Sequence, residues 1–228
     1  MESQRFVFVT GGTGYMGLPL IAQLLQRGHK VRAVVRAGSE GKLPAGCEGV
    51  VGNALDAASY AIQVPPADTF VQLVGVAHPS PSKATQFRAI DLASATGAIN
   101  AARKAGIQHF VYLSVAHPAP VMKDYIAVRT ECESVLRASG LNATILRPWY
   151  VLGPGHRWPY ALLPMYWLME RLPSTREGAR RLGLVTLAQM IRTLVHAAEN
   201  PPQGARIVEV PEIRGSGGLP EFPAARPA

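Results

Sequence analysis

The chain is poor in cysteine, which excludes several kinds of site. Its 228 residues include two cysteines, Cys47 and Cys132, which lie far apart and form no CxxC pair. A zinc cluster or a dithiol redox motif is therefore not expected. The six histidines show no HxxxH or HExxH spacing, so no metal site is expected either. Two reduced thiols are typical of a cytoplasmic protein, which is the location we expect.

Long apolar runs are also missing. The stretch Phe6–Val9 is far too short to cross a bilayer, and the segment Tyr160–Leu172 is interrupted by Pro164, Glu170 and Arg171. The first residues lack the basic and apolar regions and the cleavage site of a signal peptide. No membrane span is expected.

Basic residues outnumber acidic residues in the chain. Twenty-three Lys and Arg face fifteen Asp and Glu, a formal net charge of +8. The basic residues are spread along the chain without a stripe of interleaved aromatics, so no nucleic-acid partner is expected. An anionic small molecule, such as a phosphorylated cofactor, is the favoured partner.

Short apolar strands alternate with helical patterns through the first two thirds of the chain. Strands are expected at 5–10, 30–36, 49–51, 69–76, 109–115 and 143–146, and helices after 17, at 84–105 and at 124–138. This alternation predicts an α/β fold, a doubly wound parallel sheet with helices on both faces.

The last third has a different character. Helices are expected at 160–172 and 187–199, a short extended piece near 182–185 and a last strand at 207–210. We divide the chain into a dinucleotide-binding core (1–155), a small substrate-binding region that completes the same domain (156–213), and a disordered tail (214–228) with little to bury.

The glycines of TGGTGYMG, Thr10 to Gly17, follow the first expected strand and open the first expected helix. In this context Gly11 permits a tight turn, Gly14 lets the backbone approach a pyrophosphate, and Gly17 lets the helix pack close to the strand. The helix N-terminus supplies free N–H groups for phosphates. The alternative is a glycine-rich turn that binds nothing. The expected loop contacts are Gly11, Thr13, Gly14, Tyr15, Met16 and Gly17.

Arg36 indicates which dinucleotide is bound. Sites that prefer NAD carry an acidic residue near the end of the second strand, but the first one here is Glu40. The guanidinium of Arg36 offers a planar fork for a 2′-phosphate. NADP (NADPH) is therefore favoured over NAD, the alternative being a solvated arginine at a strand end.

Five segments in order resemble a known superfamily. TGGTGYMG is followed by GNALD (52–56), FVYLSV (110–115), YIAVR (125–129) and ILRPWYVLGPG (145–155). The series is similar to the short-chain dehydrogenase/reductase superfamily, in its extended and atypical branches, over about residues 5 to 200. Those branches include nucleotide-sugar epimerases and NmrA-like NAD(P)-binding proteins, and all have a Rossmann core. The resemblance places Asn53, Ala54 and Leu55 by the adenine, Gly75 and Val76 near the ribose, and Pro148 near the nicotinamide.

The resemblance also implies a catalytic set of Ser114, Tyr125 and Arg129. The superfamily uses a Tyr-x-x-x-Lys pair on one helix and a serine or threonine after the preceding strand. Tyr125 and Arg129 are four residues apart and share a helix face. Tyr125 would be the acid/base, Ser114 would orient the substrate and Arg129 would supply the cation. Arginine stands where lysine is expected and does not deprotonate, so Tyr125 is either catalytic or a remnant of an ancestral site.

Two further features border the expected crevice. His78, His117 and His156 each follow an expected strand, and each is either an alternative acid/base or an ordinary loop histidine. The segment Trp158–Leu172 bunches Trp, Tyr, Met and Leu. It suits an apolar substrate, with core packing or a partner or membrane-surface contact as alternatives.

Three functions remain open. The first is an NADP-dependent oxidoreductase that transfers hydride to or from a small carbonyl or alcohol substrate. The second is a non-catalytic NAD(P)-binding redox sensor or complex subunit, indicated by Arg129 in place of lysine. The third is a nucleotide-sugar epimerase or dehydratase, against which Arg36 argues. A homo-oligomer is a possible assembly.

Overall fold

The fold is given by a computed structural model that describes residues 4–155 and 158–216. Its centre is a sheet of seven strands, all parallel. The strands are β1 (Phe6–Thr10), β2 (Lys30–Val35), β3 (Glu48–Val51), β4 (Thr69–Gln72), β5 (His109–Leu113), β6 (Asn142–Arg147) and β9 (Ala205–Glu209).

The strand order is β3-β2-β1-β4-β5-β6-β9. The chain therefore runs outward from β1 to one edge, returns to pair β4 beside β1, and continues to the other edge. Val7 of β1 pairs with Val31 of β2 on one side and with Thr69 of β4 on the other. Open α/β sheets bind ligands at the carboxyl ends of the strands beside such a reversal, in the position that we call the crevice.

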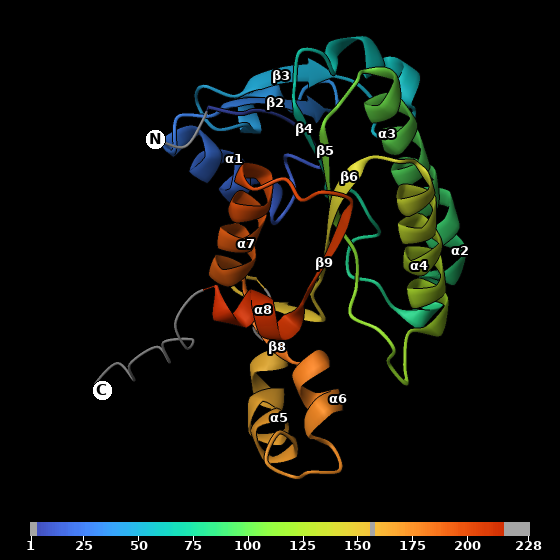
Figure 1. The fold of residues 1–228 in the computed structure, drawn as a ribbon, viewed down its shortest axis with the longest axis vertical. Helices are drawn as coiled ribbons and strands as arrows, with labels where there is room; N and C mark the ends of the chain where they lie inside the picture. Colours follow the sequence, from blue (N-terminus) through green and yellow to red (C-terminus); the bar gives the residue numbers. More distant parts are fainter. Residues whose placement is uncertain (1–3, 156–157, 217–228) are drawn as a thin grey trace.

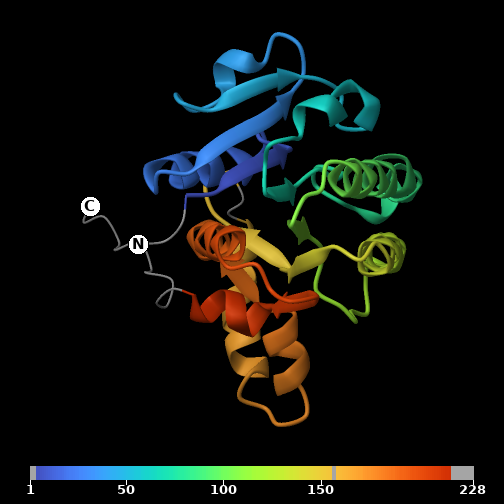
Figure 2. The same ribbon diagram turned by 45° about the horizontal axis from the view of Figure 1, so that its top comes forward.

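Helices cover both faces of the sheet (Figures 1 and 2). One face is covered by α1 (Gly17–Gln26) and α7 (Leu187–Glu199), and the other by α3 (Ala93–Lys104) and α4 (Lys123–Ala138). Alternate residues of β1 enter the two cores: Val7 and Val9 join the α1–α7 side, and Phe8 joins the α3–α4 side. The predicted doubly wound parallel sheet is confirmed.

The expected helix at 84–105 is built from three pieces. A short α2 (Ala84–Gln86) leads into a π-helical segment, η5 (Phe87–Leu92), and then into α3. Single π-turns inside helices often occur at functional sites. Here the π-turn carries Asp91, which is buried. Sequence periodicity did not anticipate this irregularity.

Short 3₁₀ turns occupy several connections. They are η1 (Glu40–Lys42), η2 (Ala57–Ser59), η3 (Ala61–Gln63) and η4 (Pro81–Lys83).

The C-terminal part forms a small second unit on the sheet. Two strands, β7 (Tyr150–Leu152) and β8 (Leu184–Thr186), pair in parallel. Between them lie a 3₁₀ turn, η6 (Trp158–Leu162), α5 (Leu163–Met169) and α6 (Arg176–Arg181). A capping box in which Thr186 and Gln189 bond each other's backbone starts α7.

Several boundaries differ from those expected. The helix expected at 160–172 is confined to α5 after a 3₁₀ turn, since Pro164 lacks a backbone N–H. The strand expected to end at 76 ends at Gln72, and α6 was not anticipated. Residues 214 and 215, which were expected in the tail, belong to α8 (Val210–Gly215). The remainder of that tail lies outside the described residues.

Within the described ranges, no helix is both long and apolar enough to cross a membrane.

Candidate active site

The glycine-rich loop joins β1 to α1 at the crevice. Gly11 has a φ of 78°, and a Cβ there would lie 3.1 Å from the backbone carbon of Leu73, which follows β4. A Cβ on Gly17 would clash with the carbonyl oxygens of Gly11 and Gly12. These two positions require glycine because the loop turns back against both its own helix and the neighbouring strand.

The loop leaves backbone donors available. The Gly14 N–H bonds the Gly11 carbonyl at 3.0 Å, but those of Thr13 and Met16 have no acceptor among the described residues. No side chain caps α1 at Met16. Unfilled N–H groups at a helix N-terminus attract anions. The loop therefore offers free N–H groups at the place where TGGTGYMG predicts the pyrophosphate of a dinucleotide.

Arg36 follows the last residue of β2 and is exposed. The described part of the chain offers its guanidinium no hydrogen bond or ion pair, so the fork is available. Arg32, on the same strand, has other partners. It donates a hydrogen bond of 2.9 Å to the Pro65 carbonyl and forms an ion pair of 2.9 Å with Glu48. Arg36 remains the basic residue at this strand end that fits a 2′-phosphate.

The loop after β3 is held in shape by its own polar side chains. The Leu55 N–H donates 3.0 Å to Asn53 Oδ1, and the Ala58 N–H donates 3.1 Å to Asp56 Oδ1. Ala54 is half-buried and Leu55 is 44% exposed. The loop thus presents an apolar side chain, as an adenine site requires, while the Asn53 side chain shapes the turn.

Gly75 and Val76, in the loop after β4, lie directly over a buried ion pair. The Val76 N–H donates 3.1 Å to Asp91 Oδ2. A Cβ on Gly75 would clash with Arg129 Nη2. Glycine is needed at position 75 because the Arg129 guanidinium packs against its backbone.

The guanidinium of Arg129 is buried, and both of its Nη atoms have partners, while its Nε has no hydrogen-bond acceptor among the described residues. Its Nη2 pairs with Asp91 Oδ1 at 2.6 Å, and its Nη1 donates to the Leu113 carbonyl at 2.7 Å and to the Tyr112 hydroxyl at 3.2 Å. Burial raises the pKa of the Asp91 carboxyl, while Arg129 and the Val76 N–H oppose that shift. Sequence reasoning missed Asp91, because an acidic residue in a helical segment ordinarily faces water.

Tyr125 stands on the first turn of α4 above this cation. Its ring lies 5.0 Å from that of Phe87, and the Arg129 guanidinium lies 5.2 Å from its centroid. Burial raises the pKa of the Tyr125 phenol, and the charge of Arg129 only partly offsets this. The phenol is therefore held in its protonated form at neutral pH.

Ser114 is buried and bonded to a carboxylate. Its hydroxyl donates 2.6 Å to Glu133 Oε1. Glu133 also accepts from Arg147 Nε at 2.9 Å and from Arg137 at 2.8 Å. Burial alone would raise the pKa of Glu133, but the hydrogen bonds from Arg147 and Ser114 outweigh it and the pKa is lowered. The structure thus brings Tyr125 and Arg129 together, and places Ser114 in a separate cluster around Glu133.

The end of β6 closes the crevice. Pro148 is buried, and its carbonyl accepts the Ala116 N–H at 2.9 Å. Tyr15 of the glycine loop reaches across to β7, since a Cβ on Gly153 would clash with the Tyr15 hydroxyl. The phosphate loop and the C-terminal region are therefore in direct contact.

The histidines differ in their surroundings. His117 Nε2 lies 3.6 Å from Glu133 Oε1, so it belongs to the Ser114 cluster. His78 is exposed with a φ of 49°, and His156 lies outside the described residues. Across the described ranges, no three His, Cys, Asp or Glu side chains converge in a way that could hold a metal ion.

A parallel sheet of this order, with a glycine-rich loop at its point of reversal, defines a dinucleotide-binding Rossmann domain. Residues 11–157 match the model of a family described as NAD(P)H-binding, and the chain belongs to that family. The predicted relationship to the short-chain dehydrogenase/reductase superfamily is confirmed.

Curated relatives include several reductases. A ceramide reductase of Caulobacter vibrioides is 25% identical over 95% of this chain and 67% of its own length. A ketoreductase of Stigmatella aurantiaca, named for a farnesyl dihydroquinoline oxide, is 28% identical over 86% of this chain and 65% of its own. A 3β-hydroxysteroid dehydrogenase/isomerase of Mycobacterium tuberculosis is 35% identical over 47% of this chain and 31% of its own. The chain thus spans between one third and two thirds of these relatives.

Solved structures share the fold. The Bordetella bronchiseptica enzyme WbmH in complex with NAD+ has a TM-score of 0.68 at 22% identity, over 89% of this chain and 75% of its own. A UDP-N-acetylglucosamine 4-epimerase of Bacillus cereus has a TM-score of 0.67 at 16% identity, over 90% and 78%. The chain is accordingly an NAD(P)-binding protein of an oxidoreductase- and epimerase-like family.

Proposed function

We propose that the chain is an NADPH-dependent reductase that converts the carbonyl of an apolar substrate to an alcohol. The observation that carries the proposal is the position of Tyr125: a protonated phenol against the buried cation of Arg129, beside Gly75 at the carboxyl end of β4. Three relatives support it by their printed names, since two are reductases and each name points to a large apolar molecule.

The binding residues follow from the site. The glycine loop and the free N–H groups of Thr13 and Met16 would hold the pyrophosphate, and Arg36 would hold the 2′-phosphate. Leu55 would cover the adenine. When bound, the nicotinamide supplies the hydride for the carbonyl carbon.

Tyr125 would complete the reduction by donating its proton to the carbonyl oxygen, which receives the electron pair of the C=O bond. The raised pKa of the phenol keeps that proton available at neutral pH. The phenolate left behind would be stabilised by Arg129 until water returns the proton. Arginine provides the charge without entering the proton transfer.

Ser114 has a different task in this proposal. Its hydroxyl proton is already donated to Glu133, so it has no proton left to donate to a substrate carbonyl. It would instead hold the loop after β5 against α4. The predicted role in orienting substrate stays a prediction that mutation can test.

The non-catalytic sensor is the second candidate, and one observation favours it. Arg129 is neutralised by Asp91 and bonded to the backbone, so its charge is committed to the fold. Nucleotide-sugar epimerisation is the third; its support is the likeness to NAD-bound and epimerase structures, which at these identities shows the fold alone.

One experiment separates the first two candidates. The wild-type chain is assayed for NADPH oxidation with apolar ketones, and the Tyr125→Phe variant is compared by turnover and by NADPH binding. The proposal expects turnover to be lost and binding retained. Failure of every ketone, or turnover that is unchanged in Tyr125→Phe, would contradict it.

A further inference from the structure

Helix α5 is apolar on all sides but is covered on only one. Its sequence is LPMYWLM. Leu162, Leu163, Tyr166 and Met169 pack inward on a small cluster with Leu152, Ala179 and Leu184. On the outer side Met165, Trp167 and Leu168 are 47%, 61% and 55% exposed. A helix that is hydrophobic all round is ordinarily buried, so the outer face of α5 is unusual.

This face lies on a part of the molecule that stands apart from the sheet. Helices α5 and α6 extend together beyond α8, and form what we call the α5–α6 projection, residues 158–181 (Figures 1 and 2). Leu172, in the turn between the helices, is 46% exposed and enlarges the apolar surface. The exposed side chains are therefore gathered at one end of the chain's fold.

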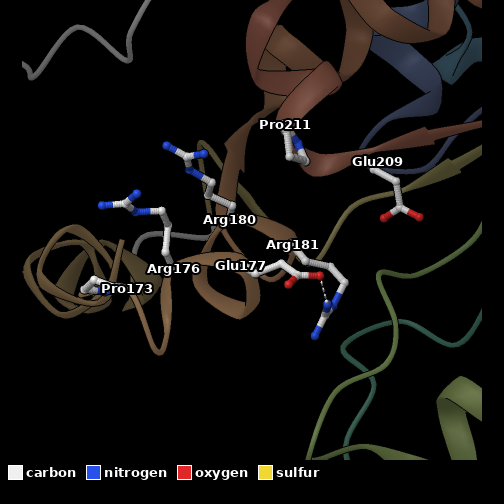
Figure 3. Close-up of a pocket in the computed structure, with 7 residues that line it drawn as sticks. All are labelled: Pro173, Arg176, Glu177, Arg180, Arg181, Glu209 and Pro211. Carbon is white, nitrogen blue, oxygen red and sulfur yellow. Dashed lines mark ion pairs between the residues drawn. The ribbon is translucent and has the colours of Figure 1, made fainter. Parts of the chain in front are cut away.

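The projection that carries the apolar face also carries arginines. The guanidinium of Arg171 stacks on the Trp167 ring, 3.2 Å from its centroid. Arg176 and Arg180 point to the same side of α6 and border a hollow of about 400 Å³ (Figure 3). The side chain of Arg180 has no hydrogen bond or ion pair within the described ranges.

The nearby carboxylates do not cancel this charge. Residues 170–181 contain four arginines and two glutamates. Glu170 is held by Arg214 at 2.6 Å, and Glu177 faces Arg181 at 3.8 Å. Within the described ranges, Arg171, Arg176 and Arg180 form no ion pair with a carboxylate, although Glu177 and Glu209 line the same hollow as Arg176 and Arg180. Arg176 donates to the backbone carbonyls of Glu170 and Arg171.

We propose that the α5–α6 projection binds the surface of an anionic phospholipid bilayer. Trp167, Leu168 and Met165 would enter the interface between headgroups and acyl chains, and the arginines would contact lipid phosphates. Exposed Trp and Leu beside Lys or Arg are typical of segments that lie on anionic membranes.

The charges favour a bilayer over a second copy of the chain. A symmetric dimer through this face would bring the arginines of one copy opposite those of the other, and like charges across an interface oppose binding. An anionic surface complements the same arginines. The inference goes beyond the proposed reduction and does not depend on it.

The test is flotation of the full chain with vesicles of phosphatidylcholine, with and without phosphatidylglycerol. We expect binding to the anionic vesicles, weaker binding to the neutral ones, and loss of binding as salt is raised. The pair Trp167→Ser/Leu168→Ser should lower the partition coefficient roughly tenfold or more, because buried apolar area drives insertion. The pair Arg176→Glu/Arg180→Glu should do the same.

Matched controls come from elsewhere on the surface. Ile62→Ser removes an apolar side chain that is 85% exposed, and Arg103→Glu/Lys104→Glu reverses two exposed charges at the end of α3. Both should leave vesicle binding within about twofold of the wild type. Thermal unfolding confirms that each variant is folded.

Three outcomes would overturn the proposal. One is no binding to either vesicle, and another is equal loss of binding in the control variants. The third is a stable dimer in light scattering that dissociates in Trp167→Ser/Leu168→Ser, which would assign the face to a second copy.

Discussion

Arg129 Nη2 and Asp91 Oδ1 form a buried ion pair 2.6 Å long that ties α4 to the π-turn before α3. The other oxygen of Asp91 accepts the Val76 N–H, so the pair also holds the loop after β4. The cation expected to assist Tyr125 is thus also part of the scaffold that holds the loop after β4.

Removing one charge of this pair should be costly. Asp91→Asn leaves Arg129 buried and uncompensated, and we expect a loss of about 3–5 kcal/mol in the free energy of unfolding. Urea denaturation measures it. Glu131→Gln, which breaks the exposed pair of Glu131 with Arg88 at 2.7 Å, should cost under about 1 kcal/mol. Equal losses of unfolding free energy in the two variants would contradict this expectation, because the buried pair would then contribute no more than an exposed one.

Tyr125→Phe removes the proposed proton donor and keeps the ring packed on Phe87. Turnover should fall by about 10²- to 10⁴-fold, which is the usual contribution of general acid catalysis. NADPH affinity, measured by fluorescence titration, should stay within about twofold. Tyr60→Phe, at a buried core tyrosine whose hydroxyl has no hydrogen-bond partner among the described residues, is the control and should turn over normally.

The pH dependence of the same reaction follows from the raised pKa of Tyr125. The phenol is protonated throughout the neutral range, so the rate of reduction should stay level there. It should decline only in strongly alkaline solution, as the proton is lost. A rate that declines between pH 6 and 8 would point to a histidine instead.

Arg36→Ala tests the choice of cofactor. Loss of a charged fork on the 2′-phosphate should weaken NADPH binding roughly 10- to 100-fold, which corresponds to about 1.4–2.7 kcal/mol. NADH lacks that phosphate and should bind within about twofold of the wild type. Arg103→Ala, at an exposed arginine on α3, should change neither affinity. Parallel losses for both dinucleotides would contradict the assignment.

Ser114→Ala distinguishes a structural from a catalytic serine. The hydroxyl bonds a buried carboxylate, so its removal should lower the free energy of unfolding by about 1.5–3 kcal/mol. Turnover should remain within a few-fold. A large loss of turnover with unchanged stability would restore the predicted substrate-orienting role.

His109 should make the protein sensitive to acid. Burial lowers its pKa to about 4, with Arg5 adding to the shift. The folded state then resists protonation while the unfolded chain takes up a proton near pH 6.5. The contribution of His109 to the free energy of unfolding is therefore fully present above pH 6.5. It is lost as the pH falls towards 4, and the loss amounts to about 3 kcal/mol. Denaturation at several pH values measures the slope, which His109→Gln should flatten.

Much of the fold was accessible from sequence because buried parallel strands are short apolar runs between turn signals. The roles predicted for the glycine loop and Arg36 rest on the same pattern, since their meaning depends on their position after a strand, and they stay predictions. The roles of Asp91 and Glu133 were not found. Carboxylates ordinarily face water, and only three-dimensional packing shows that these are buried. One signal was present: Arg129 and Glu133 fall among Val128, Cys132 and Leu136, the inward face of α4.

The helical state of Arg214 and Gly215 was not expected from sequence, for a related reason. A segment of Arg, Gly and Ser has little apolar surface to bury, so composition indicates a tail. The Arg214 guanidinium nevertheless donates 2.8 Å to the Leu184 carbonyl and pairs with Glu170. Hydropathy cannot predict a contact of this kind, because polar groups make it.

The Arg214 contact also has a practical meaning for engineering the chain. It joins the last described helix to β8 and to the start of the turn between α5 and α6. A truncation or fusion placed before position 214 would remove the contacts of Arg214 with Leu184 and Glu170, whereas one placed after Ser216 keeps them. A truncation or tag that is to keep the Arg214 contacts should therefore be placed after Ser216.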